Sequence, residues 1–292
     1  MKTKLLFLSI IAIITTSCNY SKSIKKNFIT GVTSKGNTIT CNDIYLTIDN
    51  KKINRNNFNY GEVFIINFEG VMGFIKENGN DFPGMSITVL NTNKDTILFE
   101  PDLYEQYSVK GINYKPLLIQ AMLTTASPMH SGNKYTMYVH IWDKKGSGTY
   151  DSKFEFTLNT NENIVTKKTD NVKYDEIYLF SNNTKNVITD NKVNFNEPAY
   201  IIFEGLSGFK SNDGKISLGL SLIATDSDGK TILNYPDLYN NKEITIEEFN
   251  SQIAPYIEFT KGKANNPVTC IATIWDKNSD NKITSDIILN VE

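Results

Sequence analysis

The chain contains one sequence unit written twice, and this repeat restricts its possible folds more than any other feature. Phe-Glu-Gly, Pro-Asp-Leu-Tyr and Ile-Trp-Asp-Lys each occur twice in the same order, about 134 residues apart. A repeat of this length indicates tandem domains, because solenoid repeats are only about 20–45 residues long. We place the repeated units at 42–160 and 174–292, joined by a linker at 161–173.

Hydrophobic residues recur with a period of two in both units, which is typical of β-strands. Residues 135–142 alternate between two faces, and 62–68 and 283–291 are rich in β-branched and aromatic residues. Asp-Gly pairs at 213–214 and 228–229 predict tight turns between strands. We therefore predict an all-β protein of two tandem, internally repeated antiparallel β-sandwich domains. The pattern does not separate immunoglobulin-like, C2-like and jelly-roll strand orders.

One short helix is expected in each domain. In unit 2, Thr245 and Glu248 have the spacing of a capping box, and Ile246 begins the apolar stripe that follows. The matching segment of unit 1, residues 112–126, is apolar, although Pro116 weakens its start as a helix.

The first residues have the character of an export signal. Lys2 and Lys4 precede an apolar run over residues 5–14, which is too short to span a bilayer. Small residues follow the run and lead directly to Cys18.

This arrangement resembles the processing site of bacterial lipoproteins of the Bacteroidetes type. The resemblance implies that residues 1–17 are a signal peptide and that Cys18 becomes the lipidated first residue, carrying acyl chains such as palmitate. Residues 18–41 would then be a tether between the membrane and the first domain. Surface-exported lipoproteins of this group often carry acidic residues after the cysteine, and residues 19–23 contain none. We therefore expect an outer-membrane anchor on the periplasmic face rather than on the cell surface.

Composition excludes several classes of function. The net charge is −2 and Arg55 is the only arginine, which argues against a nucleic-acid partner. His130 and His140 are the only histidines, both lie in unit 1, and no Gly-x-Ser-x-Gly motif is present. We predict no catalytic residue and no cofactor, and a bound Ca²⁺ ion is the alternative.

Six acidic residues occupy equivalent positions in the two units. They are Glu69, Asp102 and Asp143 in unit 1, and Glu204, Asp237 and Asp276 in unit 2. Carboxylates beside turns commonly accept backbone amides, and we favour this structural role. The alternative is an acidic cluster that binds Ca²⁺, which takes six to eight oxygen ligands.

One loop has the spacing of a calcium site. Asp276, Asn278 and Asp280 supply oxygens at alternate positions, and Ile283 stands at the eighth position of the loop. The twelfth position is Ile287 instead of the expected glutamate. A polar hairpin turn is therefore the main expectation and Ca²⁺ binding the alternative.

Cys41 and Cys270 are the other cysteines, and an exported compartment permits a disulfide between them. Such a bond would join the two domains. Cys270 aligns with Met137 on an apolar strand face, so a buried thiol is the alternative. Trp142 and Trp275 are the only tryptophans, and their matched positions predict that they pack in the two cores; an exposed ligand platform is the alternative.

These features favour a non-catalytic lipoprotein of the cell envelope that acts as a periplasmic scaffold or partner-binding protein. The alternative is a surface-exposed glycan-binding or adhesion lipoprotein, which exposed aromatic residues in line on one sheet would support. An envelope hydrolase is the third hypothesis. The expected partners are the membrane, through the lipid, and an envelope protein or glycan.

Overall fold

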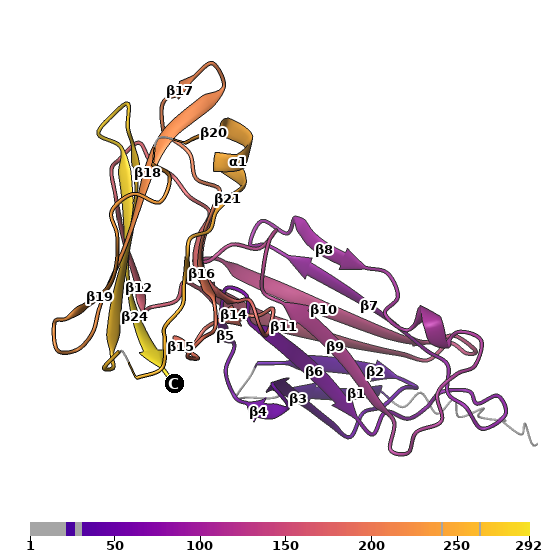
Figure 1. The fold of residues 1–292 in the computed structure, drawn as a ribbon. Coiled ribbons are helices and arrows are strands. Elements are labelled where there is room, and N and C mark those ends of the chain that lie inside the picture. Colours follow the sequence, from indigo (N-terminus) through magenta and orange to yellow (C-terminus); the bar gives the residue numbers. More distant parts are fainter. Residues whose placement is uncertain (1–21, 27–30, 241, 263) are drawn as a thin grey trace, which may run out of the picture.

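The computed structural model describes residues 22–26, 31–240, 242–262 and 264–292. The fold is all-β, as predicted, and its two sandwich domains meet near β5 and β14 (Figure 1). Within these residues, no helix is long and apolar enough to cross a membrane. Cys18 and the signal segment lie outside the described residues, so lipidation stays a prediction.

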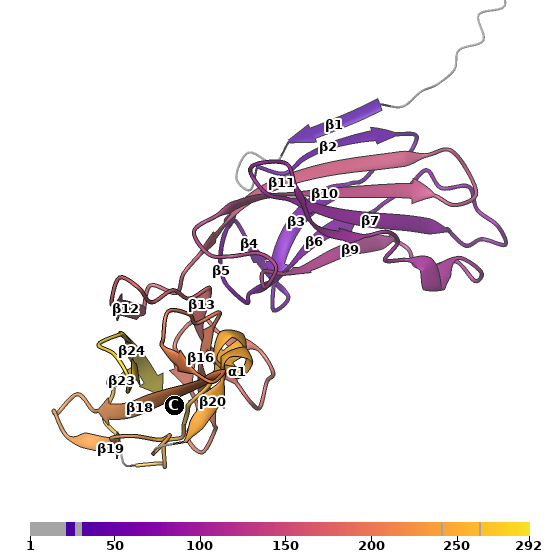
Figure 2. The same cartoon turned by 90° about the horizontal axis from the view of Figure 1, so that it is seen from above.

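Domain 1 packs a larger sheet against a smaller one (Figure 2). The larger sheet has the order β1 (Lys22–Lys26), β2 (Thr33–Asn37), β11 (Thr149–Asn159), β10 (Lys134–Asp143), β7 (Pro83–Leu90) and β8 (Thr96–Glu100). A short strand, β5 (Asn57–Asn59), runs parallel to β11. The smaller sheet has the order β4 (Lys51–Ile53), β3 (Asp43–Ile48), β6 (Val63–Glu69) and β9 (Leu118–Thr124).

Domain 2 repeats this plan. Its larger sheet has the order β12 (Ile164–Lys168), β24 (Lys282–Val291), β23 (Val268–Asp276), β18 (Lys215–Thr225) and β17 (Ser211–Asn212). At its margins β15 (Lys192–Val193) pairs with β24, and β19 (Thr231–Tyr235) and β20 (Glu243–Thr245) pair with β18. The smaller sheet contains β14 (Val187–Ile188), β13 (Glu176–Ser181), β16 (Ala199–Glu204), β21 (Gln252–Ile253) and β22 (Tyr256–Ile257).

The strand order is immunoglobulin-like. In chain order, β3, β6 and β9 form one sheet, whereas β7, β10 and β11 form the other. These correspond to strands A, B and E and strands C, F and G of the immunoglobulin sandwich. Domain 2 has the same order, so the topology selects one of the strand orders that the sequence pattern left open.

Strand β10 shows how the sequence builds these sheets. Met137, Val139 and Ile141 face the core and are almost fully buried, and the residues between them face outward. The predicted alternation over 135–142 is therefore confirmed. Because every second residue of a strand points to the same side, one slip in register would expose this whole apolar set.

Two segments expected to be irregular form strands instead. Residues 164–168 of the expected linker are β12, which pairs with β24, and residues 33–37 of the expected tether are β2, which pairs with β11. In both domains this added strand covers the edge of the larger sheet. Unpaired strand edges expose backbone hydrogen-bonding groups, and the added strands satisfy them.

The helix prediction is confirmed in domain 2 and wrong in domain 1. Helix α1 (Ile246–Ser251) begins with the expected capping box of Thr245 and Glu248. The matching part of domain 1 contains β9, whose residues alternate between exposed and buried as it pairs with β6. A short 3-10 helix (Glu105–Tyr107) precedes that segment. The alternation with a period of two, rather than the apolar content, determines the structure of this segment. As a strand, its backbone amides and carbonyls form hydrogen bonds with β6.

Two retained glycines occupy positions that no other residue fits without strain. Gly73 and Gly208 have φ of 102° and 98°. A Cβ on Gly73 would lie 2.3 Å from the Thr38 carbonyl oxygen, and one on Gly208 would lie 2.1 Å from that of Asn171. Displacing these backbone atoms to make room for a side chain would destabilise the fold, which explains why both copies keep glycine.

The disulfide hypothesis is wrong, because Cys41 and Cys270 lie in the separate cores of the two domains. The Cys41 thiol donates to the carbonyl oxygens of Asp43 and Glu69, at 3.0 and 3.3 Å. Cys270 is fully buried in domain 2, and this burial raises the pKa of its thiol to about 12.

Candidate functional site

Asp143 and Asp276 each hold the turn at the end of a central strand. One Asp143 oxygen accepts the Ile75 amide at 2.7 Å and the other accepts the Lys145 amide at 3.0 Å. Asp276 accepts the equivalent amides of Lys210 and Asn278, at 2.8 and 2.9 Å. Both carboxylates are buried. Through these hydrogen bonds each carboxylate joins the end of its strand to the loop that follows Gly73 or Gly208.

The loop with the spacing of a calcium site is organised around Asp276. In addition to its two amide donors, Asp276 accepts the Ser279 hydroxyl in a short hydrogen bond. Asn278 and Asp280 are exposed. In the part of the chain that the structure describes, no group of three or more His, Cys, Asp or Glu side chains is placed to hold a metal ion. The Asp276 oxygens act here as acceptors in a hairpin turn.

Asp102 and Asp237 bind a lysine that is also retained. Asp102 accepts the amides of Met85 and Tyr104 through one oxygen, and its other oxygen lies 2.6 Å from the Lys144 ammonium. Burial opposes ionisation, but the Lys144 ammonium and these amides together hold the pKa of Asp102 below its usual value. Asp237 and Lys277 repeat the ion pair at 2.8 Å.

Glu204 and its counterpart Glu69 have different surroundings. Glu204 accepts the Tyr178 hydroxyl at 2.5 Å and the Tyr60 hydroxyl, from domain 1, at 3.1 Å. Burial and the neighbouring Glu204 carboxylate both raise the pKa of Tyr178, so its hydroxyl remains a donor. Glu69 lies on the corresponding strand of domain 1, where Tyr45 takes the place of Tyr178. The retained acid in domain 2 has thus become part of a contact between domains.

Glu176 makes a second contact between the domains. Its carboxylate accepts the Ser131 amide at 2.6 Å and the Ser131 hydroxyl at 2.8 Å. The His130 ring nitrogen Nδ1 lies 3.9 Å from the same carboxylate. Burial raises the pKa of Glu176, while the hydrogen bonds from Ser131 oppose that shift. The alignment of the repeats places Asp43 at this position in domain 1, where it is exposed.

Apolar packing completes the contact. The rings of Tyr60 and Tyr178 have centroids 5.2 Å apart. Gly61 lies against Val187 in β14, so closely that a Cβ on Gly61 would be 2.1 Å from a Val187 methyl carbon. Domain 1 and domain 2 therefore meet through hydrogen-bonded carboxylates and through side chains in van der Waals contact. Their strands run in clearly different directions, so the molecule is bent (Figure 1).

The outer face of the larger sheet in domain 1 carries a row of aromatic rings. Tyr138, His140 and Trp142 occupy alternate positions of β10, and Tyr138 is 41% exposed. The expectation that Trp142 and Trp275 pack in the cores is wrong, because both are half-buried on outer faces. A Cβ on Gly84, the partner of Trp142, would lie 2.1 Å from the indole ring, so the ring lies flat on β7.

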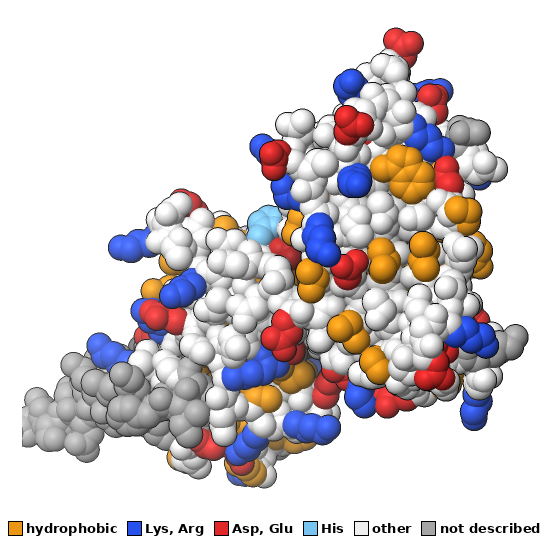
Figure 3. All heavy atoms as spheres, turned by 90° about the vertical axis from the view of Figure 1, so that its left-hand side faces the viewer, with side chains coloured by type: hydrophobic (Ala, Val, Ile, Leu, Met, Phe, Trp, Pro, Cys, Tyr) orange, Lys and Arg blue, Asp and Glu red, His pale blue; other side chains and the backbone are white. Residues whose placement is uncertain are grey.

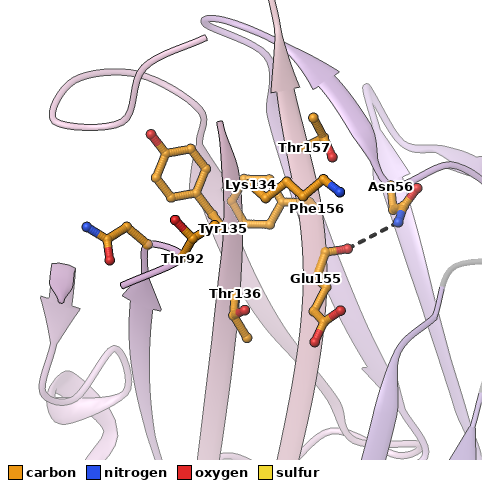
Figure 4. Close-up of a pocket in the computed structure, with 9 residues that line it drawn as sticks. Asn56, Thr92, Lys134, Tyr135, Thr136, Glu155, Phe156 and Thr157 are labelled. Carbon is orange, nitrogen blue, oxygen red and sulfur yellow. Dashed lines mark hydrogen bonds between the residues drawn. The ribbon is translucent and has the colours of Figure 1, made fainter. Parts of the chain in front are cut away.

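Two pockets lie along the same face. One, of about 290 Å³, is lined by polar side chains that include Lys134, Thr136 and Glu155 (Figure 4). Asn56 stands at its side and donates to the Glu155 carbonyl at 3.3 Å. The other pocket, of about 320 Å³, lies beside Tyr138. The outer face therefore combines aromatic rings with hydrogen-bonding groups.

The same face of domain 2 has a different chemistry. Trp275 lies flat on Gly219, as Trp142 does on Gly84, but the next positions of its strand are Thr273 and Ile271. Exposed aliphatic side chains also lie on the other strands of this sheet. They are Val165, Ile223 and Ile288. Figure 3 shows hydrophobic side chains gathered on this side of the molecule. The tryptophan on glycine is common to both domains, whereas the aromatic row is particular to domain 1.

Sequence reasoning missed the contact between the domains. Glu176 and Ser131 are distant in sequence, and no local motif marks either one. A signal was present in the repeat itself, because Glu176 replaces the Asp43 of unit 1.

No family model matches the chain, and no curated protein matches it. Solved structures give weak likenesses. Dimeric latent PorU from Porphyromonas gingivalis is 12% identical with a TM-score of 0.26, and the match covers 87% of this chain and 20% of that one. The fibronectin(III)-like modules of Clostridium thermocellum CbhA are 14% identical, with a TM-score of 0.20 and coverage of 84% and 94%.

A third likeness is to the C-terminal domain of the Streptococcus agalactiae AgI/II polypeptide BspA, at 13% identity and a TM-score of 0.26. That match covers 85% of this chain and 99% of the other. The chain spans only about a fifth of the PorU chain.

Proposed function

We propose that this protein is a non-catalytic lipoprotein of the bacterial cell envelope, a scaffold whose two domains hold a bound partner at a fixed distance and angle from the membrane. The observation that carries the proposal is the Glu176 carboxylate, which belongs to domain 2 and accepts both the amide and the hydroxyl of Ser131 in domain 1. A buried carboxylate that loses its donors is strongly destabilising, so these donors favour one arrangement of the domains.

The retained acids support a structural rather than a catalytic role. Asp102 and Asp237 are engaged by lysines, and Asp143 and Asp276 by backbone amides. General acid–base chemistry needs carboxylates within reach of a substrate. These four instead satisfy the donors of their own turns.

The position of the N-terminal strand agrees with a membrane anchor. The chain enters β1 at the end of domain 1 that is remote from domain 2 (Figure 2). A lipid on Cys18 would therefore leave domain 1 near the membrane and domain 2 farther away. Acyl chains contribute about 0.8 kcal/mol per buried CH₂, and more than one chain makes anchoring stable.

Cell fractionation and protease treatment test the location. We expect the full-length protein in the membrane fraction and a Cys18→Ala variant outside it. In intact cells the native protein should resist added protease until the cells are lysed. Degradation in intact cells would place the domains on the cell surface, and an unchanged membrane association of Cys18→Ala would contradict the lipid anchor.

Cross-linking in living cells tests the scaffold role. Gly61→Ala should disturb the contact with Val187, whereas Gly79→Ala should not, because a Cβ on Gly79 meets nothing within 4 Å. Both glycines have φ near +80°, so the two variants carry similar backbone strain. We expect the native protein and Gly79→Ala to give the same cross-linked species and Gly61→Ala to lose them. Equal yields from all three would contradict the need for a fixed arrangement.

A further inference from the structure

Two rings of the aromatic row, Trp142 and His140, are held in place before any ligand arrives. Trp142 rests on the backbone of Gly84, and the His140 ring is nearly parallel to it, with an angle of 20° and centroids 5.6 Å apart. The His140 nitrogen Nδ1 lies 2.7 Å from the Asp151 carboxylate on the neighbouring strand, which fixes the orientation of the imidazole. Rings that are already ordered lose little conformational entropy when a ligand binds.

Polar side chains border the rings. On the β11 side, Asp151 and Lys153 point to the same outer face, and Lys153 forms an ion pair with Glu155. On the β7 side, Ser86 stands opposite His140 in the strand register. Lys153 is paired with Glu155, and Asp151 is bonded to the His140 ring, so the surface beside the rings presents several hydrogen-bond donors and acceptors.

A chain of pyranose sugars has the complementary chemistry. One side of a pyranose ring presents C–H groups, which pack on the electron-rich face of an aromatic ring, and its hydroxyl groups point outward at the edges. Nearly parallel rings on a flat strand match successive sugar faces, and the side chains on either side of the rings match the hydroxyls. A peptide that binds by adding a strand would instead need the unpaired edge of a sheet.

The equivalent face of domain 2 shows which of these contacts belong to the sandwich itself. Trp275 on Gly219 repeats the tryptophan contact, so this pair serves the sandwich itself. Thr273 replaces His140, and its hydroxyl bonds to that of Thr284, which stands where domain 1 has Asp151. Of the two equivalent outer faces, as far as the structure describes them, the one in domain 1 therefore carries the features that suit a sugar.

We propose that the outer face of the larger sheet in domain 1 is a binding site for a neutral polysaccharide. Tyr138, His140 and Trp142 would support the sugar rings, and Asp151, Lys153 and Ser86 would bind hydroxyls. The pocket that contains Thr136 and Glu155 extends the same face and lengthens the site along β10 (Figure 4). This inference does not depend on the scaffold proposal, because it concerns one face of one domain.

Affinity electrophoresis of the detergent-solubilised full chain tests the site. The gels would contain laminarin, mannan, xylan or dextran, each compared with a gel without polysaccharide. We expect at least one of them to retard the native protein, and Tyr138→Ala to weaken this binding at least tenfold. Ile271→Ala is the matched control, because Ile271 occupies the equivalent position of domain 2 with a similar exposure of 37%; it should bind as the native protein does.

Tryptophan fluorescence provides a second measurement. Titration with the retained polysaccharide should change the emission of the native chain and leave that of Tyr138→Ala unchanged. Circular dichroism would verify that the variants are folded, and Asp151→Asn would replace Tyr138→Ala if the latter were not. The proposal is overturned if none of the four polysaccharides retards the native protein. Equal retardation of Tyr138→Ala, or a face that captures only a protein, overturns it as well.

Discussion

Glu204 of domain 2 accepts a hydrogen bond from the Tyr60 hydroxyl of domain 1, with Oε2 and Oη 3.1 Å apart. The Tyr60 hydroxyl accepts in turn from the Ser127 amide at 3.1 Å. One hydroxyl therefore connects a loop of its own domain to the retained acid of the other. Loss of either partner would leave the other without this bond.

Removal of that hydroxyl should destabilise the protein. We expect Tyr60→Phe to lower the free energy of unfolding by about 1–3 kcal/mol, because it deprives both Glu204 and the Ser127 amide of a partner. Tyr114→Phe is the control, since the Tyr114 side chain is 74% exposed. Urea unfolding would measure both variants, and indistinguishable midpoints would contradict the importance of this bond.

The burial of Glu176 predicts a dependence of stability on pH. Its pKa is raised in the folded state above the ordinary value of 4.5. The folded protein therefore binds more protons than the unfolded chain at pH values between the two pKa values. The contribution of Glu176 to the stability of the folded protein is greatest at pH values below its pKa in the unfolded chain. This contribution is lost as the pH rises through its pKa in the folded protein.

Glu176→Gln removes this titration. We expect the stability of the native protein, measured relative to Glu176→Gln, to fall as the pH is raised from about 4 to 7. Thermal unfolding of both proteins across that range is the measurement. A difference in stability that stays constant, or grows with pH, would show that the Glu176 pKa is not raised.

The Lys144 ion pair predicts the opposite dependence. Lys144 helps to hold the pKa of Asp102 below its ordinary value of 3.8. The ion pair therefore stabilises the folded protein at pH values above 3.8, and this stabilisation is lost as the pH falls through the pKa of Asp102 in the folded protein. Lys144→Ala should reduce stability by about 1–2 kcal/mol at neutral pH, and by less in acid. Lys52→Ala serves as control, because its pair with Asp43 is well exposed and 3.7 Å long.

The cysteines should be unreactive thiols. Burial raises the pKa of Cys270 to about 12, and the thiolate is the reactive form. In a Cys18→Ser variant, assayed without added reductant, we expect Cys41 and Cys270 to react with a thiol reagent only after the protein is unfolded. An unfolded chain that shows no reactive thiol would reveal a disulfide and contradict the structure.

Much of the fold could be predicted because it depends on local pattern and on the repeat. The alternation along β10 and the capping box at Thr245 are visible within a few residues. Each of these features is determined by backbone geometry that neighbouring residues encode directly.

The rest depends on contacts that sequence spacing does not encode. Trp142 was expected in a core, but its position relative to Gly84 on the neighbouring strand determines that it lies on the outer face. Apolar content at 112–126 suggested a helix, although pairing with β6 makes it a strand. The contact of Glu176 with Ser131 required knowledge of how the domains meet.

The central claim is that the two domains hold one fixed arrangement. Spin labels at Glu100→Cys and Lys230→Cys, both exposed, would report the distance between the domains by pulsed electron resonance in a Cys18→Ser background. We predict a single narrow distance distribution for the native interface and for Gly79→Ala, and a broad one for Gly61→Ala. A broad distribution in the protein with its native interface would contradict the account.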